Sequence, residues 1–321
     1  MNERIFGVDV GGTTVKIGLF DREGTLLRKW EIPTRREDEG KKILPDTAAS
    51  ILQEMKEQNI LPENVLGVGL GVPGPVLPDG TVERCVNLGW KETVDLDDTL
   101  GKLLGGIPVT AGNDANVAAL GEVWKGAGVG RSSAVMVTLG TGVGGGIVIN
   151  GEIICGAHGM GGEIGHMHVR DDDLDVCNCG GQGCVEQSAS ATGLVREAKR
   201  VLAANPDTES SMRKSGDALD SRRIIDCAKD GDALASQAVD TMANYLGRAL
   251  ANSAMGVDPE AFIIGGGVSR AGAFLTDIVT RYYHRYSPLS KKKSYIVLAS
   301  LGNDAGMYGA AKLVLNRFGK S

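Results

Sequence analysis

The chain has 321 residues, of which 42% are apolar and 23% charged, a composition typical of a folded globular protein. Its length exceeds that of an average domain and therefore predicts two domains. The net charge of −6 argues against a nucleic-acid partner, because proteins that bind nucleic acid carry basic surfaces.

The sequence also argues against a place in a membrane. No pattern of a secretion signal precedes the first apolar run, which begins near residue 5. The longest apolar stretch, residues 134–149, is broken by several glycines and is too short for a membrane span. We therefore expect a cytoplasmic protein without a membrane partner.

Two stretches follow the same plan of a strand, a glycine-rich bend, a second strand and a turn. The first has its strands at 5–10 and 15–20, with Gly11 and Gly12 between them. The second has its strands at 135–139 and 145–149, with Gly140, Thr141 and Gly142 after the first strand. The repetition predicts two related lobes that each open with the same pair of strands.

Elsewhere, strands alternate with helices. Apolar residues recur at helical spacing near 48–55, after Asp114 and over 235–250, whereas short apolar runs at 65–72 and 262–264 predict strands. Residues 205–223 are polar and predict an exposed connection between helices. The alternation predicts an α/β fold, although periodicity does not give the strand order.

Three glycine clusters follow apolar strands, namely Gly11–Gly12, the cluster that begins at Gly140, and Gly265–Gly267. Without a Cβ, such turns let backbone N–H groups approach phosphate oxygens, although one cluster alone is usually only a bend. The first is more specific, because Asp9 and Thr13 beside it can hold Mg²⁺, through water, next to the β- and γ-phosphates. Asp9 could instead cap a hairpin turn. The sequence has no P-loop motif.

One imidazole and three thiols lie within a short span, at His166, Cys177, Cys179 and Cys184. Three sulfurs and one nitrogen suit a closed, tetrahedral Zn²⁺ site of the structural kind. Free thiols or a redox pair are the alternatives. His168 lies on the same segment and competes with His166 for the fourth ligand position.

Together these motifs resemble those of the ROK family of sugar kinases and repressors, from Asp9 to about residue 310. Asp9-x-Gly11–Gly12–Thr13 is similar to the first phosphate loop of actin-like sugar kinases, residues 139–146 to the second, and residues 265–268 to the adenosine-side loop. The segment 162–166 and the cysteine motif narrow the resemblance to the ROK family and favour His166 as the zinc ligand.

The resemblance implies an ATP-dependent kinase that phosphorylates the 6-hydroxyl of glucose, with Mg²⁺ and a structural Zn²⁺ as further cofactors. Asp114 is implied as the catalytic base, although an aspartate at a helix start is often only an N-cap. The implied sugar contacts are Gly71, Asn113, Glu163, His166 and Glu186. The implied contacts to ATP and Mg²⁺ are Asp9, Gly11, Gly12, Thr13, Thr14, Gly140, Thr141, Gly142, Gly265, Gly266 and Gly267.

For the fold, the resemblance implies two ribonuclease-H-like lobes of the actin-like ATPase type around a central cleft. We expect a small lobe at residues 1–112 plus 304–321, and a large lobe with the zinc loop at 113–303. Homodimers or homotetramers are common in the family.

Two alternatives remain. The acceptor could be another sugar, such as N-acetylmannosamine, N-acetylglucosamine, allose or fructose, because the motifs indicate the chemistry better than the sugar. A sugar-responsive repressor is the alternative from a different class. It would need a helix-turn-helix ahead of the phosphate loop, which begins here at residue 9, so we disfavour it.

Overall fold

The computed structural model describes residues 3–172, 175–289 and 292–319. Strands and helices alternate along it, which confirms the α/β class. The chain divides into two compact units. The first comprises Met1–Ser133, Gly146–Gly162 and Ser300–Ser321, and the second comprises Ala134–Gly145 and Glu163–Ala299.

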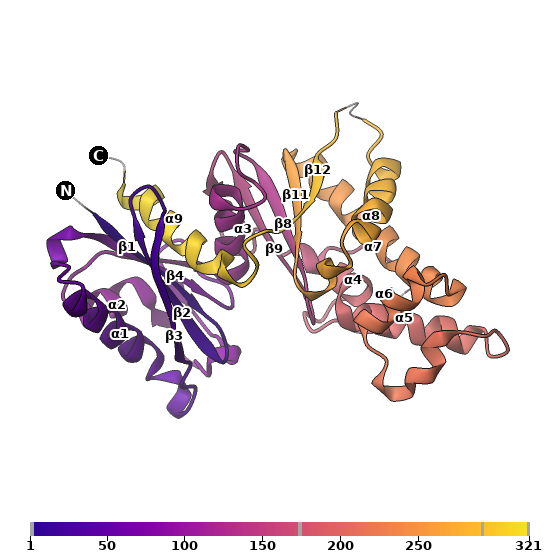
Figure 1. The fold of residues 1–321 in the computed structure, drawn as a ribbon, viewed down its shortest axis with the longest axis horizontal. Coiled ribbons are helices and arrows are strands. Elements are labelled where there is room, and N and C mark those ends of the chain that lie inside the picture. The colour runs from indigo at the N-terminus through magenta and orange to yellow at the C-terminus, as the bar shows by residue number, and fades with distance from the viewer. Residues whose placement is uncertain (1–2, 173–174, 290–291, 320–321) are drawn as a thin grey trace. The chain divides into compact units, whose positions relative to one another are not determined.

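The first unit contains a five-stranded sheet of order β3–β2–β1–β4–β7 (Figure 1). Neighbours among β1, β2 and β3 are antiparallel, whereas β4 runs parallel to both β1 and β7. The bounds are β1 Arg4–Val10, β2 Thr14–Asp21, β3 Leu26–Pro33, β4 Val65–Val72 and β7 Val109–Asn113. Strand β4 is almost wholly buried, which explains why its sequence is a continuous apolar run rather than an alternating one.

The second sheet repeats this topology, with the order β10–β9–β8–β11–β12. Here β9 and β10 are antiparallel, and β11 is parallel to both β8 and β12. The bounds are β8 Ala134–Leu139, β9 Val143–Ile149, β10 Glu152–Ile153, β11 Ala261–Gly265 and β12 Tyr295–Leu298. The two strand pairs recognised as a repeat in the sequence, β1–β2 and β8–β9, hold equivalent places in the two sheets.

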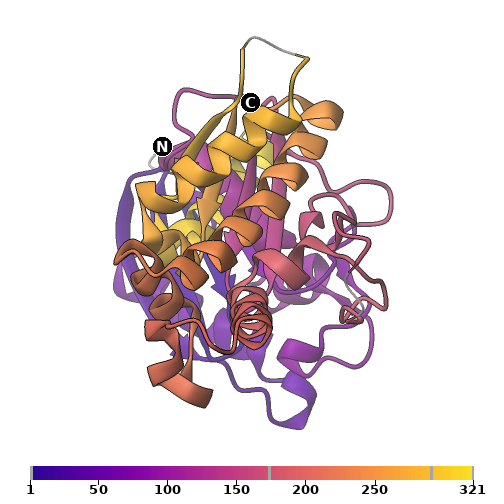
Figure 2. The ribbon, with the colours of Figure 1, turned by 90° about the vertical axis from the view of Figure 1, so that its right-hand side faces the viewer.

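Helices cover these sheets. In the first unit they are α1 Ile43–Glu57, α2 Leu96–Leu103, α3 Asp114–Lys125 and α9 Ala305–Phe318. In the second they are α4 Val185–Ala189, α5 Ala191–Ala204, α6 Ser221–Lys229, α7 Ala233–Val257 and α8 Ala273–Tyr286. Helices α7 and α8 lie side by side over one face of the second sheet (Figure 2). Among the described residues, no helix is both long and apolar enough to cross a membrane.

Helix α9 packs tightly against β4 and α3 because glycines remove side chains at the contacts. A Cβ on Gly69 of β4 would lie 1.8 Å from the carbonyl oxygen of Ala310. A Cβ on Gly309 of α9 would lie 1.7 Å from the carbonyl oxygen of Val117 on α3. The close packing of α3 and α9 makes both helices part of the first unit.

Glu122 of α3 fixes the point where the chain re-enters the first unit at Ser300. Its side chain is fully buried. The carboxylate accepts hydrogen bonds from the N–H groups of Ser300 (3.0 Å), Leu301 (2.8 Å) and Ala127 (2.8 Å). A buried carboxylate is tolerated only when such donors replace water.

The unit boundaries differ from those expected from the sequence, which placed residues 113–303 in one lobe. Residues 113–133 and 146–162 belong to the first unit, since α3 packs on α9. The polar stretch 205–223 is also more ordered than expected. It contains a 3₁₀ helix at Ser211–Ala218, in which Met212 is buried, and the first residues of α6.

Candidate active site

A cavity of about 510 Å³ in the first unit brings together four of the residues predicted to hold Mg²⁺ and phosphate, those of the first glycine loop and Asp9. Its wall comes from the end of β1, the following glycine loop, the segment after β3, the segment after β4 and the start of α3. The lining residues are Asp9, Val10, Gly11, Gly12, Thr13, Arg36, Pro73, Asn87 and Asp114. The cavity therefore joins the predicted catalytic base to the first phosphate loop.

Asp9 lies near the end of β1 and close to the start of α9. A Cβ on Gly306 would lie 2.5 Å from the Asp9 carboxyl carbon, so glycine is needed there. Burial raises the pKa of Asp9 to about 6, the Lys16 ammonium opposes this, and the negative charge of Asp114 adds to it. A desolvated carboxylate of this kind gains most from a bound cation.

Asp114 is the first residue of α3, and the N-cap is Asn113, the last residue of β7. The Asn113 side-chain oxygen accepts from the N–H groups of Ala115 (3.0 Å) and Asn116 (3.1 Å). Its amide nitrogen donates to the Gly74 carbonyl (3.0 Å) and to the Asp114 carboxylate (3.1 Å). Asn113 thus takes the capping role that the sequence left open for Asp114.

These four bonds use the full capacity of an asparagine side chain, which has two donor hydrogens and two acceptor lone pairs. Asn113 therefore holds Asp114 in place and uses all its hydrogen-bonding positions in this structure. Two other predicted residues lie outside the cavity wall. Thr14 is the first residue of β2, and Gly71 is buried in β4, where a Cβ would meet Val117 at 3.4 Å.

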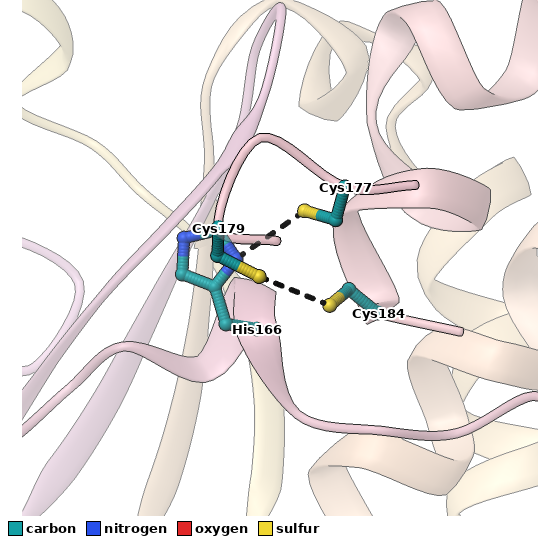
Figure 3. A group of neighbouring side chains, drawn as sticks. All are labelled: His166, Cys177, Cys179 and Cys184. Atoms are coloured by element: carbon teal, nitrogen blue, oxygen red, sulfur yellow. Dashed lines mark hydrogen bonds between the residues drawn. The ribbon is translucent and has the colours of Figure 1, made fainter. Parts of the chain in front are cut away.

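The second unit brings the four predicted zinc ligands together. His166, Cys177, Cys179 and Cys184 point toward one another, and their ligand atoms all lie within 4.8 Å of one another (Figure 3). The Sγ atoms of Cys179 and Cys184 are 3.7 Å apart, and Cys177 Sγ is 3.6 Å from His166 Nδ1.

These spacings fit a tetrahedral Zn²⁺ site. Two sulfurs at usual zinc distances would lie about 3.8 Å apart, and a sulfur and a nitrogen about 3.6 Å apart. Burial and the neighbouring thiols raise the pKa of Cys184 to about 12. Without a cation, three thiolates in this space would therefore repel one another.

His168, which competed with His166 as the fourth zinc ligand in the sequence, makes other contacts with both ring nitrogens. Its Nδ1 is 2.8 Å from the carbonyl oxygen of Gln182, and its Nε2 is 2.8 Å from Asp171 Oδ1. His166 has a different neighbour on the side away from the cysteines, since its Nε2 lies 3.8 Å from Glu163 Oε2. Both Glu163 and His166 are partly exposed and can reach a ligand as well as each other.

Glu186 connects the cysteine cluster to the second glycine loop. Its Oε2 accepts from the N–H of Val143 (2.9 Å), and its Oε1 lies 3.8 Å from Cys177 Sγ. A Cβ on Gly142 would come within 2.2 Å of the same carboxylate, so glycine leaves room here for the Glu186 side chain. The predicted sugar residue therefore also positions the loop.

Two backbone carbonyls of this glycine loop accept hydrogen bonds from the start of α5. The N–H of Ala191 donates to the Gly140 carbonyl (2.8 Å), and the Thr192 hydroxyl donates to the Thr141 carbonyl (2.8 Å). In the part of the chain that the structure describes, the N–H groups of Thr141 and Gly142 donate to no other group. Both N–H groups are therefore available to donate a hydrogen bond to an anion.

The third glycine cluster borders a cavity of about 420 Å³ within the second unit. Gly267 lines it, together with Ser221, Arg222, Lys229 and Arg270. Gly265 and Gly266 do not. Gly266 has a positive φ of 83°, and a Cβ there would lie 2.5 Å from the Leu139 carbonyl oxygen, so its glycine serves the packing of β11.

The sequence assigns no role to Arg36. For Asn87, in the loop Asn87–Leu88–Gly89–Trp90, it favours a role in positioning the loop, with a sugar contact as the alternative. Both line the first cavity. Asn87 carries some signal, since it lies in a glycine-flanked turn. Arg36 carries none, because an arginine in a polar segment after a strand is usually only a solvated side chain.

Known proteins resemble this chain over nearly its whole length. The sequence profile of the ROK family matches residues 5–317. The chain is 41% identical to a glucokinase of Halalkalibacterium halodurans over 319 residues, which are 98% of this chain and 96% of that protein.

Two solved structures extend the comparison. One is a ROK family glucokinase from Streptomyces griseus in complex with glucose and AMPPNP, with a TM-score of 0.73 and 35% identity over 97% of this chain and 98% of that one. The other is a ROK hexokinase from Thermus thermophilus, with a TM-score of 0.80 and 31% identity over 96% and 97% of the two chains. The expected fold of an actin-like sugar kinase is confirmed, and the chain belongs to the ROK family.

Proposed function

We propose that this protein is an ATP-dependent glucokinase that transfers the γ-phosphoryl group of ATP to the 6-hydroxyl of glucose. The observation that carries the proposal is the cavity whose wall joins Asp114 to Asp9 and to the loop at Gly11, Gly12 and Thr13. A carboxylate for the acceptor hydroxyl and a site for metal-bound phosphate are the two parts that phosphoryl transfer requires. The likeness to the two glucokinases supports glucose as acceptor and ATP as donor.

Asp114 acts as the catalytic base in this proposal. An alcohol is a poor nucleophile, so its proton must leave as the new O–P bond forms. Because the transition state of phosphoryl transfer is loose, the carboxylate mainly orients the hydroxyl and accepts its proton late. The hydrogen bond from Asn113 supports this role, since it fixes the carboxylate at the cavity wall.

Asp9 and the glycine loop serve the phosphate end. The buried Asp9 carboxylate, next to Thr13, fits the oxygen ligands and water shell that Mg²⁺ prefers. Bound there, Mg²⁺ would offset charge on the β- and γ-phosphates. The N–H groups of Thr141 and Gly142 are the donors we propose for phosphate in the second unit, and Gly267 with its cationic neighbours would receive the nucleoside end.

His166 and the three cysteines would hold a structural Zn²⁺. Four protein ligands leave no open position, so the metal would order the loop without taking part in the reaction. Glu163, His166 and Glu186 are the sugar contacts that we propose in this unit, and their clustering around the metal loop supports this. We further propose that the enzyme is cytoplasmic and forms a homodimer or homotetramer, as the family resemblance implies.

A coupled assay over a panel of sugars tests the proposal. With ATP and Mg²⁺, we expect the highest kcat/KM for glucose among glucose, fructose, allose, N-acetylglucosamine and N-acetylmannosamine. A higher value for another sugar would contradict glucose as the substrate and leave the kinase intact. The absence of turnover with every sugar would contradict the kinase itself.

A further inference from the structure

Arg36 occupies a special place in the first unit, because it lines two neighbouring cavities. One is the cavity of about 510 Å³ that also contains Asp9 and Asp114. The other, of about 470 Å³, is lined on its far side by the segments around Thr34 and Val86. The residues common to both walls are Gly12, Thr13 and Arg36. Arg36 therefore lies beside the predicted first phosphate loop.

The backbone around Arg36 is fixed to that loop. Thr34, two residues earlier, donates from its N–H to the Thr13 carbonyl (2.9 Å) and from its hydroxyl to the Gly11 carbonyl (2.7 Å). The Arg36 carbonyl accepts from the N–H of Gly40 (3.1 Å). The side chain therefore extends from a positioned main chain, although it is itself exposed.

The charge of Arg36 has no partner within residues 3–172, 175–289 and 292–319, where the guanidinium makes no ion pair and no side-chain hydrogen bond. Nearby cations differ in this respect. Arg35 pairs with Asp46, and the Lys16 ammonium donates to the Asn303 carbonyl (3.0 Å). An anion that reaches Arg36 would therefore break no existing contact.

Without a cation such as Arg36, the negative charges in the cavity wall would disfavour the binding of phosphate. Asp9 and Asp114 both line the larger cavity and both repel an anionic phosphoryl group. A guanidinium matches phosphate oxygens with two parallel N–H donors, and a cation aimed at a transferring phosphoryl group stabilises its charge.

We propose that Arg36 binds the phosphoryl group that is transferred, either as the terminal phosphate of the nucleotide or as the phosphate of the sugar phosphate product. This inference rests on the proposed kinase function and adds a residue to it. In the first unit, the positive charge of Arg36 would then offset the repulsion between the phosphoryl group and the carboxylates of Asp9 and Asp114.

The test compares R36M with R35M, a matched control that removes the adjacent arginine and its ion pair to Asp46. Both side chains are exposed, so both variants should fold, and thermal melting checks this. We expect kcat of R36M to fall by about 10²-fold, with partial recovery in R36K, and R35M to stay near wild type.

Direct binding distinguishes the two phosphate sources and does not depend on turnover. Calorimetry with Mg²⁺-AMPPNP and with glucose 6-phosphate should show weaker binding to R36M of one or both, and the affected ligand identifies the state that Arg36 holds. If R36M matches R35M in turnover and in both affinities, the inference is overturned. If the wild type phosphorylates no sugar, the proposed function fails, while the AMPPNP comparison still decides the role of Arg36.

Discussion

The side-chain amide of Asn113 donates a hydrogen bond of 3.1 Å to the carboxylate of Asp114. The same amide caps α3 and reaches the Gly74 carbonyl beyond β4, so one residue links a strand end, a loop and the first residue of a helix. Residues of the first unit thus help to set the position of the proposed base.

The first prediction concerns the proposed base. Asp114→Asn keeps the size of the side chain but removes the proton acceptor, so kcat should fall by at least about 10²-fold. Affinity for glucose and for AMPPNP should stay near that of the wild type. Asp95→Asn is the control, because Asp95 also begins a helix, as the N-cap of α2, but lies outside the cavity wall. Steady-state turnover equal to that of the wild type would remove Asp114 from the mechanism.

The second prediction separates positioning from sugar binding at Asn113. Asn113→Ala should cost about 1 kcal/mol of stability through the lost cap. Because Asp114 also loses the hydrogen bond from the Asn113 amide, kcat should fall while the KM for glucose changes little. Asp95→Ala loses a comparable cap and should keep its activity. A rise in KM at constant kcat would instead indicate that Asn113 contacts the sugar.

The third prediction concerns the metal. Cys179→Ser, or removal of zinc by a chelator, should abolish glucose affinity at temperatures where the fold persists, because the proposed metal would order the segments that carry Glu163 and Glu186. Zinc content by mass spectrometry, glucose calorimetry and circular dichroism test this together. Cys155→Ser, which lies outside the cluster, should change none of them. Verified metal-free protein that binds glucose normally would contradict the role.

The fourth prediction follows from the pKa of Asp9, which burial raises to about 6 from the usual value of 3.8. Because the folded state favours the protonated form, stability should decrease as the pH rises from about 4 to about 6, and then level off. Without Mg²⁺ and nucleotide, Asp9→Asn should therefore be more stable than wild type at pH 8, by up to about 3 kcal/mol.

That difference should vanish below about pH 4, where Asp9 is protonated in both states. The same variant should lose most of its kcat at pH 8, since an amide is a poorer Mg²⁺ ligand. Thermal melting across this pH range tests the stability effect. Equal melting temperatures of the two proteins at pH 8 would show that burying the charged Asp9 carboxylate does not destabilise the folded protein.

The fifth prediction concerns Glu122. In Glu122→Gln the new amide nitrogen cannot accept a hydrogen bond from the N–H groups of Ser300, Leu301 or Ala127, so at least one of these bonds to the buried side chain is lost. We expect a loss of about 2–4 kcal/mol in the free energy of unfolding. Glu57→Gln, at the exposed end of α1, should have almost no effect. Chemical denaturation measures both, and equal midpoints would contradict the anchoring role.

The fold class and the repeated strand pairs could be predicted from the sequence alone, and the structure confirms them. The phosphate loop at Asp9 and the ligand set at His166 also come from the sequence and stay predictions. These features are encoded locally, in apolar periodicity, in glycines that follow strands, and in ligands a few residues apart. The structure brings the four metal ligands together because glycine turns allow a short segment to fold back on itself.

Which polar residues line the same cavity could not be predicted from the sequence and follows from the tertiary fold. In the fold, Asn113 and not Asp114 caps the helix, and α3 lies with α9 in the first unit. Arg36 lines the same cavity as Asp114, although the two residues are far apart in the sequence. Such contacts depend on strand order and on how closely helices approach a sheet. Neither is encoded in the periodicity of a single segment, because both result from the packing of segments that are distant along the chain.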